Sequence, residues 1–497
     1  MTRIAALSVA LLLSACAVGP DFEKPAPPAA KDYGSAPMAG ETVATQGQGQ
    51  SGAAQRFVAG MDIPAQWWTL FHSPKLSKLV EHAIKNNPDV AAAQAALRQS
   101  HELYSAQWTS FFPTVQGNFN AARTKNAQNT IAPLTTSSNP TYNLYTAQLS
   151  LSYAPDVFGA NIRATEAAKA QEESSRFQLE ATYLTLASNV VVTAIQEASL
   201  RGQVAATERL LALQHQLTEI VRRQRTLGSA SALDLAAQEA TEAQTAQTLP
   251  PLEKQLGQSR DALTALLGRL PSEEPAETFT FDDLVLPTDL PVSLPSKLVE
   301  QRPDVRQAEE NLHAATAQVG VAVSAMLPQF DIAAGNGSSA FQAAQLFAPG
   351  NGFWSVGGSI TQTLFDAGAL LHKRRAADAA MDQAAAQYKS TVILACQNVA
   401  DTLRALKADA DMLKAADHGV DATRTAFDTA RRRLAIGAVS EAALMNAEQA
   451  YQQAEIALVQ ARANRYSDTA ALYQALGGGW WNRKEEDRDG QSGLAGE

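Results

Sequence analysis

Cysteine is almost absent from this chain of 497 residues, and its scarcity excludes several classes of protein. Only Cys16 and Cys396 occur, so the chain is not a small disulfide-stapled domain and has no cysteine cluster that could bind zinc.

Positively charged residues are also fewer than negatively charged ones. The chain has 40 lysine and arginine residues and 50 acidic residues, which gives a formal net charge of −10. This balance lacks the electrostatic footprint of nucleic-acid binding, and we expect no nucleic-acid partner.

Aromatic residues and proline are scarce in a way that favours long helices. Aromatic side chains make up 6% of the chain, whereas alanine makes up roughly a fifth, a pairing that suits closely packed helices better than a bulky globular core. No proline occurs between Pro155 and Pro250, and none follows Pro349. Two long segments therefore lack the strongest helix breaker.

Long apolar runs are missing after the N-terminus, so no later segment predicts a transmembrane helix. The apolar run at residues 4–13 follows Arg3 and has the charge and length of a secretory signal. It leads into Leu-Ser-Ala-Cys, which resembles the bacterial lipobox. We therefore expect a signal peptide over residues 1–15 and acylation of Cys16, a covalent lipid that is the only non-protein group expected. Ala17 stands where inner-membrane retention usually shows an aspartate, which favours the outer membrane.

The rest of the chain contains one plan twice. Asn-Pro-Asp-Val at 87–90 returns as Arg-Pro-Asp-Val at 302–305, and the Gly-x-x-Ser pattern at 228–231 returns at 437–440. Such internal similarity predicts two structural repeats. Flanking segments rich in proline, glycine and glutamine, or in charge, predict a tether and a disordered tail. The expected parts are a tether over 16–65, repeat 1 over 66–270, an equatorial linker over 271–300, repeat 2 over 301–481 and a charged tail over 482–497.

Each repeat has two segments in which apolar and polar residues alternate. They lie at about 114–123, 144–153, 329–335 and 353–364. Segments of about ten residues with this period suit the tilted strands of an outer-membrane sheet, although an ordinary half-buried sheet gives the same alternation. Four strands are too few to close a membrane barrel, and open strand edges are not tolerated in lipid. A membrane section therefore needs strands from several chains.

The two proline-free segments predict helices of unusual length. The expected long helices cover about 160–227 and 368–436, and the expected return helices cover 229–268 and 438–476. At 1.5 Å per residue, each long helix spans roughly 100 Å. Gly228 and Gly437 suit the left-handed position that ends a helix, so each long helix is expected to turn back there.

Several short strings, in this order around this repeat, carry a resemblance to a known family. They are Cys16-Ala17-Val18-Gly19-Pro20-Asp21-Phe22, Trp67-Trp68-Thr69-Leu70-Phe71, Asn86-Asn87-Pro88-Asp89, Leu249-Pro250-Pro251-Leu252-Glu253, Leu298-Val299-Glu300-Gln301-Arg302-Pro303-Asp304-Val305 and Thr363-Leu364-Phe365-Asp366-Ala367-Gly368. With these strings, the chain resembles the TolC-like outer-membrane efflux proteins, specifically the lipoprotein branch with NodT and OprM.

The resemblance implies a fold that is mainly α with a membrane β section. In such a fold three identical chains form a homotrimer, close one twelve-stranded β-barrel in outer-membrane lipid, and continue it as a periplasmic α-helical barrel. The implied function is the passive exit duct of a tripartite pump, docked to a periplasmic adaptor (membrane fusion) protein and driven by an inner-membrane RND-type transporter. The duct itself is not expected to be an enzyme.

The candidate functional residues lie where the long helices turn back. Small residues there would let an adaptor helix approach the backbone closely, although a glycine with positive φ is enough to explain each turn. Clustered cations either complement the helix dipole or serve docking and the field at the tunnel mouth. The tip residues are Gly228, Ser231, Gly437 and Ser440; the charges are Arg222, Arg223, Arg225, Arg431, Arg432 and Arg433, with Asp234 and Glu441 near enough to pair with them.

A gate and a metal site are the remaining site hypotheses. Asn446 occupies the position that is usually acidic in the family, so a gate built from a ring of carboxylates is in doubt. The seven histidines form no i,i+4 pair, and no metal site is expected.

Transport of small molecules, such as drugs and organic solutes, is the function that these features favour. Type I polypeptide secretion and metal-ion efflux stay open as alternatives within transport. A pore-free coiled-coil lipoprotein scaffold is the alternative outside transport, and the alternating strands argue against it because a scaffold has no need of them.

Overall fold

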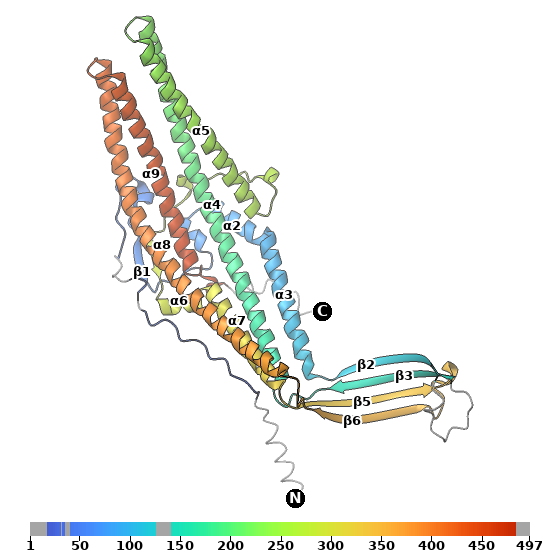
Figure 1. Ribbon diagram of the computed structural model, residues 1–497. Helices are drawn as coiled ribbons and strands as arrows, with labels where there is room; N and C mark the ends of the chain where they lie inside the picture. Colours follow the sequence, from blue (N-terminus) through green and yellow to red (C-terminus); the bar gives the residue numbers. More distant parts are fainter. Residues whose placement is uncertain (1–16, 31, 35–39, 126–140, 484–497) are drawn as a thin grey trace. The chain divides into compact units, whose positions relative to one another are not determined.

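The computed structural model describes residues 17–30, 32–34, 40–125 and 141–483, most of them helical (Figure 1). The chain divides into two compact units, which we call the sheet unit and the helical unit. The sheet unit comprises Met1–Lys24, Leu97–Ser175 and Ala308–Tyr388, and the helical unit comprises Pro25–Ala96, Arg176–Gln307 and Lys389–Glu497. Among the described residues, no helix is both long enough and apolar enough to cross a membrane.

The sheet unit holds a four-stranded antiparallel sheet. Its strands are β2 (Thr114–Lys125), β3 (Thr141–Tyr153), β5 (Gln329–Ala340) and β6 (Gly352–Thr361), in the spatial order β2-β3-β5-β6 (Figure 1). One row of the register places Val115 opposite Leu151, which faces Ala334, which faces Val356. Because directly opposed residues of antiparallel strands point to the same side, this row marks a mainly apolar face.

The other side of the sheet is polar. The neighbouring row of the register joins Gln116, Ser150, Gly335 and Ser355, and Asn118 Nδ2 donates a hydrogen bond to Ser150 Oγ over 3.2 Å. In these two neighbouring rows, the alternation between apolar and polar residues therefore extends across all four strands.

Four helices dominate the described chain. α4 (Ala160–Thr226) and α8 (Ala369–Ala435) have 67 residues each, and α5 (Ala232–Leu266) and α9 (Glu441–Ala475) have 35 residues each. The two longer helices run through the proline-free segments and reach roughly 100 Å at 1.5 Å per residue.

The shorter α-helices within the described residues all begin at a proline. They are α2 (Pro74–Asn86), α3 (Pro88–Trp108), α6 (Pro295–Gln301) and α7 (Pro303–Ser324). Proline suits the first helical position because its fixed φ is already helical and its missing N–H would have no partner in the helix. Proline, which is missing from α4 and α8, therefore marks the starts of the short helices.

The structure differs from the flexible tether expected over residues 16–65. β1 (Arg56–Ala59) pairs in parallel with β4 (Asp289–Val292), and Thr42 and Gln55 are buried in the helical unit. The segment has few apolar side chains, which is why composition favours a tether. It is held by backbone pairing and by hydrogen bonds between polar groups instead.

The core of the helical unit is aromatic where residues 67–71 pack against residues 466–473. Trp67 stacks on Tyr473 with ring centroids 5.4 Å apart, and Phe71 lies 6.4 Å from Tyr466. Trp67, Phe71, Tyr466 and Tyr473 each have at most 1% of their surface exposed. Burial of such large side chains contributes much of the stability of a core.

Candidate functional site

The apolar face of the sheet is the first candidate site. Several of its large side chains are exposed, and they include Phe119 (68%), Trp354 (76%), Val356 (70%) and Ile360 (68%). A contiguous exposed apolar surface of this kind marks contact with lipid or with another protein. Alternating apolar and polar faces on strands of 10 to 13 residues fit a membrane sheet with a lipid side and an aqueous side.

The second candidate site is the turn between α4 and α5. Gly228 has φ of 76°, which suits the left-handed end of a helix. Ser231 is the N-cap of α5, and its Oγ accepts a hydrogen bond from Asp234 N over 3.2 Å. The Asp234 carboxylate in turn accepts from Ser231 N over 2.8 Å, which completes a capping box. The hydrogen bonds from Ser231 hold the pKa of Asp234 below its ordinary value.

Arg222 has other partners than the sequence suggests. Arg222 binds Glu219 on its own helix and Glu239 on α5, the latter over 2.9 Å. Its hydrogen bond to Glu239 is the main cause that raises the pKa of Arg222. The suggested pairing of Asp234 with these arginines is replaced by the capping box, because a carboxylate at the third helical position lies closest to the free N–H groups of the helix start.

The remaining cations lie at the ends of the two long helices. Arg223 and Arg225 fall in the last turn of α4, and Arg432 and Arg433 fall in the last turn of α8, just after Arg431. Arg432 Nε donates to the carbonyl oxygen of Asp428 over 3.2 Å. Cations in this position complement the partial negative charge of a helix C-terminus.

The turn between α8 and α9 repeats the backbone of the first turn. Gly437 has φ of 71°, and Ser440 caps α9 by accepting from Ala443 N over 3.3 Å. Glu441 follows, and its pKa is raised by burial and then by the negative charge of Asp234. The two acids therefore repel each other, where the sequence suggested that both would pair with arginines. Asn446 is exposed on α9.

Two features of the tips escaped sequence reasoning. Leu227, Leu233 and Ile436 flank the two turns and are 82%, 78% and 78% exposed; apolar residues next to a turn glycine are the signal that could have found them. Glu448 is the second feature, an acid only 1% exposed, with no hydrogen-bond partner for either carboxylate oxygen among the described residues. Burial raises its pKa to about 7.

The spacing of Glu448 could have signalled its burial. It lies four residues after Leu444, which packs with Leu217 of α4 and Phe427 of α8, and residues four apart share one face of a helix.

A metal site is not found in the part of the chain that the structure describes. Its residues contain no group of three or more His, Cys, Asp or Glu side chains that could hold a metal ion. Cys16 lies outside the described residues.

Comparison with known families gives the class of the protein. The sequence model described as "Outer membrane efflux protein" matches residues 79–269 and 294–478, most of the chain. The chain belongs to the outer membrane efflux protein family, a family of transport channels. It is an outer-membrane protein and serves as the exit duct of an efflux system, which confirms the predicted function and location.

Particular relatives and solved structures match nearly the whole chain. The pyoverdine export outer membrane protein OpmQ of Pseudomonas putida is 29% identical over 476 residues, covering 95% of this chain and 97% of its own. The toluene efflux pump outer membrane protein TtgC of Pseudomonas putida is also 29% identical, with 95% of each chain covered. The outer-membrane channel OprN is 28% identical with a TM-score of 0.83, covering 94% of this chain and 100% of OprN. The Campylobacter jejuni CmeC channel, at 22% identity and a TM-score of 0.84 over 95% and 97% of the two chains, shares the fold. The predicted fold class, a mainly helical TolC-like channel, is confirmed.

Proposed function

We propose that three copies of this chain form a homotrimer whose sheets close one twelve-stranded β-barrel. The observation that carries this proposal is the register of the sheet, which places large apolar residues of the four strands, such as Phe119, Leu151 and Trp354, on one side. Within the described chain, β2 and β6 each pair along one edge only. Since lipid does not tolerate open strand edges, the β2 edge of one copy is expected to pair with the β6 edge of the next.

The helices continue the barrel into the periplasm as an α-helical barrel, built from two tandem repeats. The equal lengths of α4 and α8, and of α5 and α9, support the repeats. The two tips then face a periplasmic adaptor protein, which links the duct to an inner-membrane RND-type transporter. Gly228, Ser231, Gly437 and Ser440 provide close backbone approach, and the exposed Leu227, Leu233 and Ile436 provide apolar contact.

Cys16 carries the covalent lipid of the mature N-terminus, and the sequence 13–16 supports this modification. The barrel and the lipid together hold the protein in the outer membrane. The duct moves solutes passively, and we expect it to need neither a catalytic residue nor a metal cofactor.

The solutes are small organic molecules, including drugs. Relatives over nearly the full chain are named for toluene efflux, antibiotic efflux and pyoverdine export, and all three names describe small molecules. Polypeptide secretion and metal-ion efflux remain the alternatives to be tested against this class. A pore-free scaffold is disfavoured because the apolar face of the sheet would then contact water.

The trimer is tested by native mass spectrometry of the full-length protein in detergent, where three chains per particle are expected. A stable folded monomer that conducts ions across a bilayer would overturn it.

The solute class is tested in a strain lacking the gene, which should become sensitive to apolar drugs and solvents and recover with the gene restored. Sensitivity to metal salts alone, or loss of a secreted polypeptide alone, would favour one of the alternatives.

A further inference from the structure

The segment directly after Cys16 is docked tightly within the sheet unit. Val18 N donates to the carbonyl oxygen of Phe158 over 3.2 Å. A Cβ added to Gly159 would lie 2.5 Å from the Cα of Ala17, and one added to Gly19 would lie 2.4 Å from the Cα of Gly320. Contacts this close are open only to glycine, so the backbone of residues 17–19 lies against the start of α4 and the end of α7.

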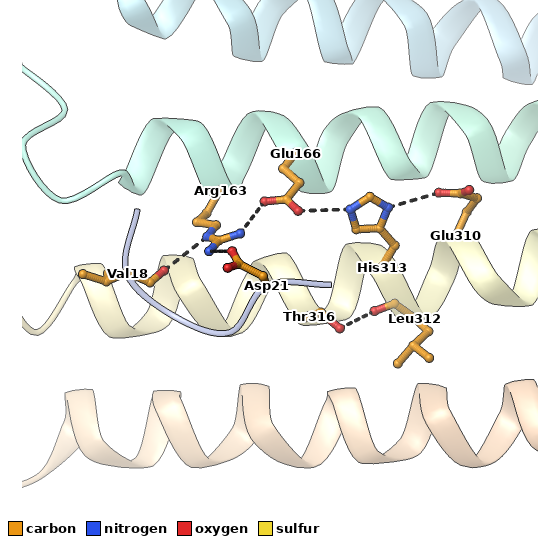
Figure 2. Close-up of polar contacts among 8 residues, drawn as sticks. All are labelled: Val18, Asp21, Arg163, Glu166, Glu310, Leu312, His313 and Thr316. Carbon is orange, nitrogen blue, oxygen red and sulfur yellow. Dashed lines mark hydrogen bonds and ion pairs between the residues drawn. The ribbon is translucent and has the colours of Figure 1, made fainter. Parts of the chain in front are cut away.

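A buried arginine holds this segment. Arg163, in the first turn of α4, is 5% exposed. Its Nη2 donates to Asp21 Oδ1 over 2.5 Å, its Nε donates to the carbonyl oxygen of Val18 over 3.2 Å, and its Nη1 donates to Glu166 over 2.8 Å (Figure 2). Burial lowers the pKa of Arg163, but the hydrogen bonds to Asp21 and Glu166 outweigh it and leave the pKa above its ordinary value.

The contacts continue along α7. Glu166 also reaches His313, whose Nε2 lies 3.0 Å from Glu166 Oε1 and whose Nδ1 lies 3.3 Å from Glu310 Oε2 (Figure 2). The ring of Phe22 stacks on the His313 imidazole at 4.3 Å with 15° between the planes. Asp21 thus contacts the sheet unit through its charge, and Phe22 contacts it through ring stacking.

An independent second arginine holds residues 42–55 in the helical unit. Arg465 of α9 is fully buried. Its guanidinium donates to Thr42 Oγ1 over 3.1 Å, to Gln55 Oε1 over 3.3 Å, and to two backbone carbonyls, Ser51 over 3.0 Å and Ala53 over 2.5 Å. A buried guanidinium without partners is very costly. All four acceptors come from the N-terminal segment, so the burial of Arg465 depends on that segment.

We propose that residues 17–24 and 42–55 are the two docked parts of an N-terminal strap, and that Arg163 is the positioning residue that fixes the lipid-bearing end beside the sheet. The proposal rests on the acylation of Cys16 proposed above. Ala17 packs on Gly159, six residues after the end of β3 at Tyr153. A lipid on the neighbouring residue is thereby directed to the helix-side end of the membrane sheet, instead of ranging over the length of a tether.

Hydrogen exchange with mass spectrometry on the full-length protein in nanodiscs tests the proposal, because the N-terminal peptide gives two independent measurements. Its mass reports acylation, and its deuterium uptake over residues 17–24 reports docking. We expect strong protection in the native protein. Asp21→Asn removes the exposed carboxylate of the strap that binds Arg163 and leaves Glu166 in place. About tenfold faster exchange is expected for the loss of one charge-assisted hydrogen bond.

Three variants make the test specific. Glu23→Gln alters an exposed carboxylate two residues away and should change nothing; Asp21→Glu keeps the charge and should restore protection. Asp21→Asn should leave residues 42–55 unchanged, whereas Thr42→Val should loosen those residues alone. An unprotected native peptide, or Asp21→Asn exchanging like the native protein, overturns the docking. A protected peptide that carries no lipid overturns the positioning role and the acylation while the docking stands, so the two failures are distinguishable.

Discussion

The two helical hairpins have the same backbone plan but are held together by different chemistry. In the first hairpin (α4 and α5), exposed polar pairs join the helices, namely Arg222 with Glu239 over 2.9 Å and His215 with Glu242 over 3.0 Å. In the second hairpin (α8 and α9), Phe427 stacks on Tyr451 with ring centroids 5.9 Å apart and planes within 6°. The same Gly-x-x-Ser turn therefore serves a polar and an apolar hairpin, and the repeat of sequence does not extend to the contacts.

Because different contacts join the two hairpins, different solution conditions should loosen them. Exposed ion pairs are weakened by salt, whereas an apolar contact is not. The second hairpin also contains the buried Glu448, whose pKa is raised by burial to about 7. We therefore expect salt to act on the first hairpin and pH to act on the second.

The largest expected effect comes from changing both turns at once. Gly228→Leu with Gly437→Leu should abolish efflux while trimer and membrane insertion persist. A Cβ at either glycine meets no atom within 4 Å, so the strain is confined to the positive φ, about 1–2 kcal/mol per residue. Loss of efflux would then report the blocked approach of an adaptor helix. Drug susceptibility, adaptor crosslinking and trimer yield should be measured on the same strains.

Gly60→Leu is the matched control for the turns, because Gly60 also has a positive φ of 75° and open space at its Cβ. It should leave efflux intact. Asn tolerates positive φ, so Gly437→Asn should keep more efflux than Gly437→Leu. Unchanged susceptibility in the double Leu variant would remove the docking role, and loss of its trimer would reduce the glycines to a structural role.

Glu448→Gln should give the next largest effect. The folded-state pKa of about 7 lies above the ordinary 4.5, so the folded protein binds this proton more tightly and stability falls as pH rises from about 4.5 to 7. Removing the charge should stabilise the second hairpin by ~3 kcal/mol above pH 8 and have little effect below pH 4.5. Melting temperatures across this range should show a flatter curve for the variant. The exposed Asp421→Asn is the control, and curves that stay parallel for Glu448→Gln and the native protein would contradict the burial of a charge.

Arg222→Gln should have a smaller effect, confined to the first hairpin. Arg222 is exposed and pairs across the hairpin with Glu239, so proteolysis near Gly228 should increase modestly at low salt and match the native protein at high salt. Arg432→Gln is the counterpart, because Arg432 donates to a carbonyl of its own helix, and it should change nothing at the second turn. An equal response of both tips would remove the contrast between the hairpins.

The sequence predicts the backbone of this protein better than it predicts the contacts between its side chains. Missing prolines, turn glycines and two-residue alternation are local signals, and they indicate helices and strands within a few residues of α4, α8 and β3. The burial of Arg465 depends on acceptors more than 400 positions away in sequence, such as Gln55, and no local pattern marks such a pair. Asp234 is an intermediate case. It was expected to pair with nearby arginines, whereas its spacing of three residues from Ser231 is a local signal that fits a capping box.

The smallest expected effect belongs to Asn446→Ala. Asn446 is exposed on α9, and alanine is a better helix former than asparagine, so neither folding nor efflux should decline. An uncharged amide cannot sustain a ring of ion pairs in a trimer, and its loss should leave susceptibility to drugs unchanged. Asn446→Asp is the informative contrast, because three carboxylates around one axis would repel one another and attract cations. Altered cation conductance in the Asp variant alone would show that this position faces the duct. A clear loss of efflux in the Ala variant would instead assign the amide itself a role in shaping the tunnel, and the contrast between the hairpins would then have to include a polar contact on the second.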